Sequence, residues 1–235
     1  MSRRQAILTD NLHRVQSRIA AAAERAGRSP EEITLVAVTK YVSADVTRLI
    51  IEAGHHVLGE SRPQQLCDKA RALADLPVRW HLIGHLQRNK VRRTLPVVEL
   101  IHSLDSIALL DTIERIAEEE NLTVRGLLEV NISGNPNKHG FLADAVPEVV
   151  AGLGKYRRLH IEGLMCMGGW AGDLTGAARE FAALREMRDR LAADCPPPHQ
   201  LVHLSMGMTN DFEIAIAEGA TMVRIGSALF EGLDD

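Results

Sequence analysis

The sequence predicts a (β/α)8 barrel of the TIM type with an extra amino-terminal helix. Three observations predict it. Short runs of aliphatic and β-branched residues alternate with helical patterns from residue 33 to the end. Strands separated by helices of this length pair in parallel through right-handed crossovers. Eight such strands can be counted, and the 235 residues come close to the ~250 that are typical of this barrel.

The elements follow one another in a regular order. An amphipathic helix is predicted over residues 3–27, where Ile7, Leu12, Val15 and Ile19 recur at roughly helical spacing. The predicted strands are residues 33–40, 56–60, 79–84, 98–103, 125–132, 159–167, 201–205 and 222–226. The predicted helices between them are residues 43–53, 62–73, 106–120, 142–152, 175–193 and 211–218.

The alternative architecture is a doubly wound open sheet. Against it, the first strand is followed by Thr39-Lys40-Tyr41-Val42, where a dinucleotide-binding sheet carries a glycine fingerprint. No linker, repeat or low-complexity segment divides the chain. One domain over residues 1–235 is therefore expected.

The charge pattern argues against a protein that binds nucleic acid. The net charge is −4, which is unlike that of a general polyanion binder. The one basic cluster consists of Arg88, Lys90, Arg92 and Arg93. We interpret it as a solvated helix start, with contact to phosphate or nucleic acid as the minor alternative.

The cysteines and the amino terminus indicate a cytoplasmic protein. Cys67, Cys166 and Cys195 are odd in number and scattered, which suits a reducing compartment better than a disulfide framework. Met1-Ser2-Arg3-Arg4 does not begin a secretory signal, and no run approaches the ~20 apolar residues of a membrane span. No contact with a membrane is expected.

Lys40 ends the first predicted strand. The carboxyl ends of parallel strands are where such folds place their chemistry. A lysine there has one special use, which is imine formation with a carbonyl compound. The alternative is a lysine that only leaves the sheet and reaches water. Lys40 alone does not decide between them.

The last two predicted strands are followed by loops that suit a phosphate. Residues 203–211 join the seventh strand to a helix and supply glycine and the hydroxyls of Ser205 and Thr209. The alternative is an ordinary capped helix start. Gly226 and Ser227 can add amides after the eighth strand. Phosphate sites in barrels are often built by these two loops, so the pair is a stronger signal than either alone.

Arg224 lies inside an apolar strand, where an unpaired guanidinium is costly, so it needs a carboxylate or a ligand atom as acceptor. Lys40 and the two loops together suit a phosphorylated aldehyde. Pyridoxal 5′-phosphate (PLP) is the obvious candidate.

These residues belong to a longer resemblance. The chain resembles the pyridoxal-phosphate homeostasis protein family, which is related to the barrel of alanine racemases and ornithine decarboxylases. The resemblance covers the chain almost end to end, in the order Val36-Ala37-Val38-Thr39-Lys40, Gly59-Glu60, residues 80–90, Val130-Asn131-Ile132-Ser133 with Lys138 and Gly140, residues 163–167, residues 205–211 and Arg224-Ile225-Gly226.

The resemblance implies a role for each matching residue. Lys40 is the Schiff-base lysine, three residues bind the phosphate, and Arg224 points at the pyridine nitrogen as in related barrel enzymes. Three further residues line the pocket. The phosphate ligands are Ser205, Gly207 and Gly226, and the pocket residues are Asn131, His81 and Met165. Two places depart from the family pattern: Ser61 stands where asparagine is usual, and no glycine directly follows Phe230.

The histidines do not predict a metal site. His55 and His56 are adjacent, and His81 and His85 straddle a strand end, so neither pair supplies three convergent ligands. Asp105 is expected to be a residue of a helix start. Lys138 and His139 are expected to be solvated in a loop.

Three functions remain. The resemblance favours a carrier or buffer of PLP, with apo-enzymes that need PLP as possible recipients. The alternatives are a PLP-dependent racemase or decarboxylase and, less favoured, a class I aldolase. The sequence ends nine residues after Gly226, so we expect no second β-rich domain, an open site and a monomer.

Overall fold

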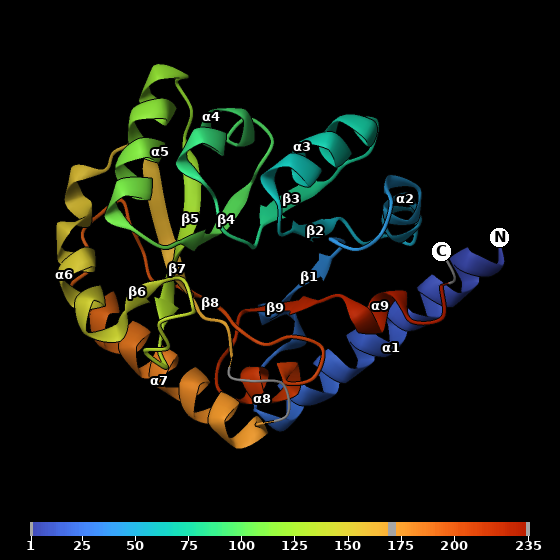
Figure 1. Cartoon of the computed structure of the whole chain (residues 1–235). Coiled ribbons are helices and arrows are strands. Elements are labelled where there is room, and N and C mark those ends of the chain that lie inside the picture. The colour runs from blue at the N-terminus through green and yellow to red at the C-terminus, as the bar shows by residue number, and fades with distance from the viewer. Residues whose placement is uncertain (1, 169–172, 234–235) are drawn as a thin grey trace.

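The computed structural model describes residues 2–168 and 173–233 (Figure 1). Its strands are β1 (Thr34–Val38), β2 (Val57–Glu60), β3 (Arg79–Leu82), β4 (Leu100–Leu104), β5 (Val124–Asn131), β6 (Phe141–Leu142), β7 (Leu159–Met165), β8 (His203–Ser205) and β9 (Met222–Ile225). Its helices are α1 (Arg3–Arg25), α2 (Ala44–Glu52), α3 (Pro63–Ala72), α4 (Val91–Thr94), α5 (Ile107–Glu119), α6 (Val146–Ala151), α7 (Leu174–Ala192), α8 (Phe212–Ala217) and α9 (Ser227–Phe230).

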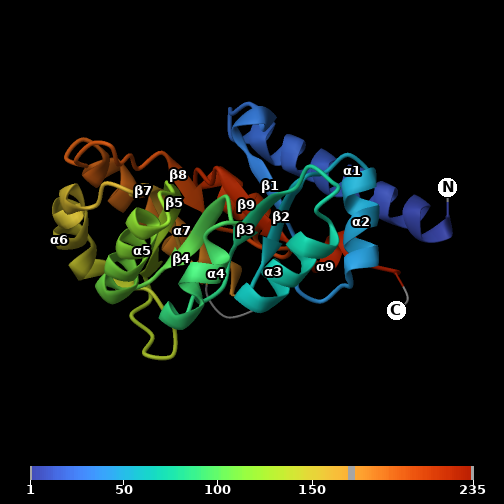
Figure 2. The same cartoon turned by 90° about the horizontal axis from the view of Figure 1, so that it is seen from above.

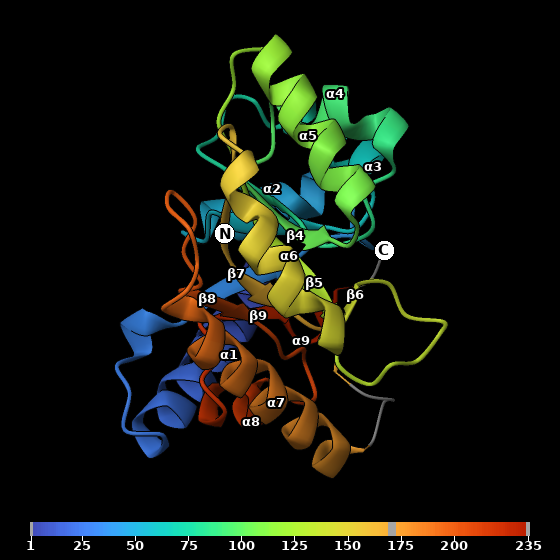
Figure 3. The same cartoon turned by 90° about the vertical axis from the view of Figure 1, so that its left-hand side faces the viewer.

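The strands form a closed parallel barrel. Their order is β4-β3-β2-β1-β9-β8-β7-β5, and β4 pairs with β5 to close the ring. The two-residue strand β6 adds to the end of β5 and is not part of the ring. Helices cover the outside, with α5, α6 and α7 along the side that Figure 3 shows. The predicted (β/α)8 barrel is confirmed.

The predicted elements are all present, and most have slightly shorter ends, whereas β4, β5 and α7 each extend one residue beyond the predicted bounds. Two helices were missing from the prediction, α4 and α9, because four residues are too few for a periodic pattern. Residues 142–152 were predicted as one helix. That stretch begins in β6 and a 3-10 turn, and α6 starts only at Val146.

The amino-terminal helix α1 lies against α8 and α9 (Figures 1 and 2). The Ser2 side chain caps it by accepting a hydrogen bond from the Gln5 amide. Asn11 is buried and its Nδ2 donates to the carbonyl oxygens of Leu229 (3.1 Å) and Glu231 (2.8 Å). The extra helix thereby fastens the segment that follows the last barrel strand.

The core has two parts. The larger apolar cluster packs the helices against the outside of the barrel. A separate cluster takes one residue from each of four strands, which we place in the barrel interior: Leu100, Leu127, Met165 and Met222. Among the described residues, no helix is both long and apolar enough to span a membrane.

Candidate functional site: a cavity at the strand ends

A cavity of about 500 Å³ opens at the carboxyl ends of the strands. Its wall comes from the loops after β1, β2, β3, β7, β8 and β9 and from the start of α7. This is the end of the barrel where the fold places its chemistry. The lining residues are Val38, Lys40, Tyr41, Val42, Ser61, Ile83, Gly84, Met167, Asp173, Leu174, Ala177, Met208, Thr209, Asn210, Asp211, Arg224, Gly226, Ser227 and Phe230.

Lys40 enters this cavity two residues after the end of β1. Its side chain is half-buried, and its Nζ lies 4.8 Å from the centroid of the Tyr41 ring. Tyr41 is 86% exposed and forms part of the rim. No carboxylate of the described chain forms an ion pair with Lys40, so its amine is available to a ligand.

A buried ion pair holds the backbone from which Lys40 departs. Glu60, at the end of β2, is fully buried, and its Oε1 lies 2.5 Å from Lys69 Nζ. Lys69 Nζ also donates to the Thr39 carbonyl (2.7 Å), and Thr39 Oγ1 donates to Glu60 Oε1 (2.6 Å). These three bonds join Thr39, the residue before Lys40, to the end of β2 and to α3. The direction in which Lys40 leaves the strand is therefore fixed by the interior.

Two hydroxyls meet on the wall formed by the loops after the neighbouring strands β9 and β8. Ser227 Oγ and Thr209 Oγ1 are 3.0 Å apart and come from the loops after β9 and β8. The backbone amides of Thr209 and Asn210 have no acceptor among residues 2–168 and 173–233. Hydroxyls and free amides are the groups that bind phosphate oxygens in loops of this kind.

Gly207 and Asp211 shape the loop that carries Thr209. Gly207 has φ +92°, and a Cβ there would lie 2.6 Å from Ala215 Cβ and 2.9 Å from Phe212 Cα. Only glycine allows this turn and the close contact with α8. Asp211 Oδ1 accepts a hydrogen bond from the Met208 amide at 2.5 Å. The loop is thus held with Thr209 and Asn210 toward the cavity.

Arg224 reaches the cavity floor from β9 although only 3% of it is exposed. Its Nη1 donates to Ser205 Oγ (2.5 Å), and its Nη2 donates to the Cys166 carbonyl (2.9 Å) and lies 3.5 Å from Met167 Sδ. None of these acceptors is a carboxylate. Burial lowers the pKa of Arg224 from its usual value, but an arginine remains protonated in proteins. The buried cation therefore still suits a ligand acceptor.

Behind Arg224, hydrogen bonds continue through two histidines. His102 Nδ1 is 2.8 Å from Ser205 Oγ, and His102 Nε2 is 2.9 Å from His81 Nδ1. Because Arg224 donates to Ser205, the serine proton can be donated to His102, which then donates to His81. Burial lowers the pKa of His81 to about 4 and that of His102 well below its usual value. Both rings are therefore neutral at pH 7.

The structure brings together only part of the predicted site. Lys40, Arg224 and Gly226 line the cavity, and Gly207 shapes its loop. Ser61, which stands where the family usually has asparagine, also lines it. The four other predicted residues lie outside the lining, namely Ser205, His81, Met165 and Asn131.

The structure places the Ser205 side chain away from the cavity lining. Its hydroxyl is fully buried and already engaged by Arg224 and His102, so its side chain does not face the cavity. The hydroxyls that do face it belong to Thr209 and Ser227. The strand ends at Ser205, and the alternation of side chains along a strand turns this residue into the barrel.

The other three residues also have interior or structural contacts. His81 bonds to His102, and Met165 packs in the separate apolar cluster. Asn131 Nδ2 donates to the Asn135 carbonyl at 2.8 Å, so it ties down the loop after β5. Sequence reasoning missed His102. It could have been found from its position two residues after Leu100, because residues two apart on a strand lie on the same face of the sheet.

Comparison with known proteins agrees with this geometry. The family model "Alanine racemase, N-terminal domain" matches residues 11–234. A pyridoxal phosphate homeostasis protein of Aquifex aeolicus is 40% identical over 221 residues, which cover 94% of this chain and 96% of the relative. The chain belongs to the pyridoxal phosphate homeostasis protein family. The resemblance found in the sequence is confirmed.

Further members of the family are similar over nearly their whole length. The pyridoxal phosphate homeostasis protein of Escherichia coli K12 is 37% identical, and the alignment covers 97% of this chain and 97% of the relative. The structure of PipY of Synechococcus elongatus PCC7942 with PLP bound is 30% identical, with a TM-score of 0.83, and covers 95% of this chain and 99% of PipY.

Proposed function

We propose that this chain binds PLP through a Schiff base at Lys40 and acts as a carrier or buffer of the cofactor in vitamin B6 homeostasis. The observation that carries the proposal is the shared cavity, which is lined by Lys40 and by Thr209 and Ser227, whose hydroxyls meet. A volume of about 500 Å³ lies in the range of small-molecule sites. The names of the relatives and the PLP bound to PipY support the same ligand.

The cavity offers a partner for each part of the cofactor. The Lys40 amine suits the aldehyde, with which an unprotonated lysine condenses by losing water. The Thr209 and Ser227 hydroxyls and the free loop amides suit the phosphate oxygens. Apolar side chains such as Ile83 and Leu174 suit the faces of the ring.

Arg224 is expected to weaken the capacity of bound PLP to act as an electron sink. PLP acts in catalysis as an electron sink, and this capacity depends on the protonated pyridine nitrogen. Arg224 lines the cavity as a permanent donor, and a donor opposite the nitrogen disfavours its protonation. The ring would then stabilise a carbanion poorly.

The charged residues that line the cavity also favour a carrier over an amino-acid enzyme. Among the described lining residues, the cations are Lys40 and Arg224, and the anions are Asp173 and Asp211. Once PLP engages both cations, no further lining cation is left to bind the carboxylate of an amino acid. We therefore take apo-enzymes that need PLP, rather than amino acids, as the partners.

The first test concerns Lys40. The purified protein with PLP is expected to show a visible chromophore that borohydride bleaches, and mass spectrometry is expected to find the pyridoxyl adduct on Lys40. Lys40→Ala should lose the adduct, while Lys155→Ala, which replaces an exposed lysine paired with Asp111, should keep it. An adduct that forms only on Lys90 or Lys138 contradicts the assignment.

The carrier role is tested with the same loaded protein. It is expected to activate an apo-enzyme that needs PLP and to leave a panel of amino acids unchanged. Racemisation or decarboxylation at ordinary enzymatic rates, ~1–10³ s⁻¹, would favour the enzyme alternative instead.

The Thr209 and Ser227 hydroxyls give a second prediction. Thr209→Val and Ser227→Ala should each weaken PLP binding about tenfold or more, because a hydrogen bond to a charged group contributes roughly 1.5–3 kcal/mol. Equilibrium titration of the loss of free PLP measures this. Thr112→Val on the exposed face of α5 is the matched control and should bind normally. Normal binding by both wall variants would place the phosphate elsewhere.

A further inference from the structure

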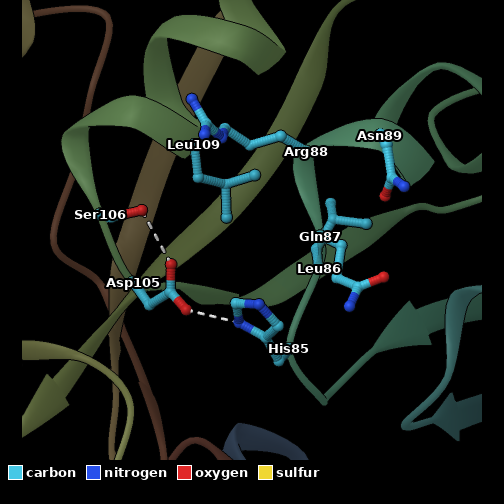
Figure 4. Close-up of a pocket in the computed structure, with 8 residues that line it drawn as sticks. All are labelled: His85, Leu86, Gln87, Arg88, Asn89, Asp105, Ser106 and Leu109. Atoms are coloured by element: carbon cyan, nitrogen blue, oxygen red, sulfur yellow. Dashed lines mark hydrogen bonds and ion pairs between the residues drawn. The ribbon is translucent and has the colours of Figure 1, made fainter.

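A second cavity, of about 520 Å³, lies at the loops after β3 and β4 (Figure 4). It shares no lining residue with the cavity that holds Lys40. Residues 85–89 and the segment from Asp105 to Leu109 form its wall. His85 and Asp105 point toward one another there, so two metal-ligating side chains meet at its edge.

A third ligating side chain completes this cluster. His85 Nδ1 lies 2.7 Å from Asp105 Oδ2, and His139 Nδ1 lies 3.8 Å from the same oxygen. One ligand atom from each residue falls within 4.8 Å of the others. The two imidazole rings are stacked, with centroids 4.5 Å apart. Asp105, which directly precedes the N-cap Ser106 of α5 as predicted, is therefore shared by two histidines.

The cluster is built by the ends of three consecutive strands. His85 follows β3, Asp105 follows β4, and His139 comes from the loop after β5, which projects from the barrel in Figures 2 and 3. Gly140 has φ +109°, and a Cβ there would lie 2.8 Å from the Glu129 carbonyl oxygen. Glycine lets the loop close against β5, and the Asn131 side chain ties it from within.

We propose that His85, Asp105 and His139 form a binding site for a divalent first-row transition metal ion such as Zn²⁺. Ligand distances of 2.0–2.2 Å give a tetrahedron with edges of roughly 3.4 Å, and the observed 2.7 Å and 3.8 Å lie on either side of that value. Two imidazoles and one carboxylate are the ligand set of several zinc sites that keep one position open. The adjoining cavity supplies the space for that fourth ligand.

The surroundings of Asp105 support a metal ligand. Its Oδ1 accepts a hydrogen bond from Ser106 Oγ at 3.0 Å, which leaves Oδ2 for the histidines (Figure 4). Outer partners of this kind orient metal-binding carboxylates. Asp105 is nearly buried, whereas His85 and His139 are 41% and 63% exposed on their side chains, so an ion can enter from solvent.

The test is a calorimetric titration of the tag-free, PLP-loaded full chain with zinc chloride. One zinc per chain is expected at this site. His85→Asn, Asp105→Asn and His139→Asn should each weaken binding more than the 10–100-fold that is typical for loss of an outer partner. His13→Asn, an exposed histidine on α1, is the matched control and should bind zinc as the unmodified protein does.

Two further measurements separate this site from others. A crystal soaked in zinc is expected to show an anomalous peak among His85, Asp105 and His139. Because Cys67 and Cys195 are only partly buried thiols, cobalt should also be titrated, and no thiolate-to-cobalt absorption band is expected. Zinc binding that is absent up to millimolar concentration, or equally strong in all three ligand variants, would overturn the proposal.

Discussion

Glu60→Ala is expected to lower the free energy of unfolding by about 3–5 kcal/mol, the usual cost of removing one partner from a buried ion pair. The substitution leaves Lys69 with its ammonium nearly buried and its carboxylate partner gone. It also removes the acceptor of the Thr39 hydroxyl. Urea denaturation at pH 7.5, followed by circular dichroism, measures the loss.

Two controls show whether the loss comes from the unpaired charge. Glu52→Ala, at an exposed position of α2, should change stability by no more than about 0.5 kcal/mol. The double substitution Glu60→Leu with Lys69→Met removes both charges and should recover much of the lost stability, because apolar replacements of a buried pair are often neutral or stabilising. A loss below about 1 kcal/mol for Glu60→Ala contradicts the role given to this pair.

The stability contribution of His81 is expected to be lost as the pH falls from about 6.5 to about 4, whereas Glu129, whose pKa burial raises to about 7, contributes in the opposite direction. Burial lowers the pKa of His81 from 6.5 to about 4 in the folded chain. Below pH 6.5 the unfolded chain therefore binds a proton that the folded chain refuses. By linkage, the stability present above pH 6.5 is lost toward pH 4, by ~3 kcal/mol for this group. His102, whose pKa is also lowered by burial, acts in the same direction.

Urea denaturation at several values between pH 7.5 and pH 4.5 measures this loss. The pH dependence of the free energy of unfolding is compared between the unmodified protein and His81→Asn. The difference gives the contribution of His81, because the carboxylates that also titrate are the same in both proteins. His13→Asn is the control and should keep the full pH dependence. Nuclear magnetic resonance measures the protonation of the His81 ring directly in the unmodified protein. A His81 ring that becomes protonated near pH 6.5 would contradict the prediction.

The barrel and the general position of the site could be predicted from the sequence. Apolar runs separated by helical patterns leave few ways to pair strands, so the order of elements gives the parallel ring. In such a ring all carboxyl ends meet at one face. Lys40, Thr209 and Ser227 follow strand ends, and they line one cavity although they are far apart in sequence. Position along a strand was enough to bring them together.

The directions of the side chains near the strand ends could not be predicted from the sequence and follow from the folded barrel. Ser205 ends β8, yet its hydroxyl turns into the barrel, because a shift of one residue in register reverses the face of every side chain. The Glu60–Lys69 pair and the His85–Asp105–His139 cluster depend on distances between neighbouring elements. Such distances are set by barrel closure and loop packing. Local sequence patterns fix the order of elements along the chain, but contacts across the ring arise only when it closes.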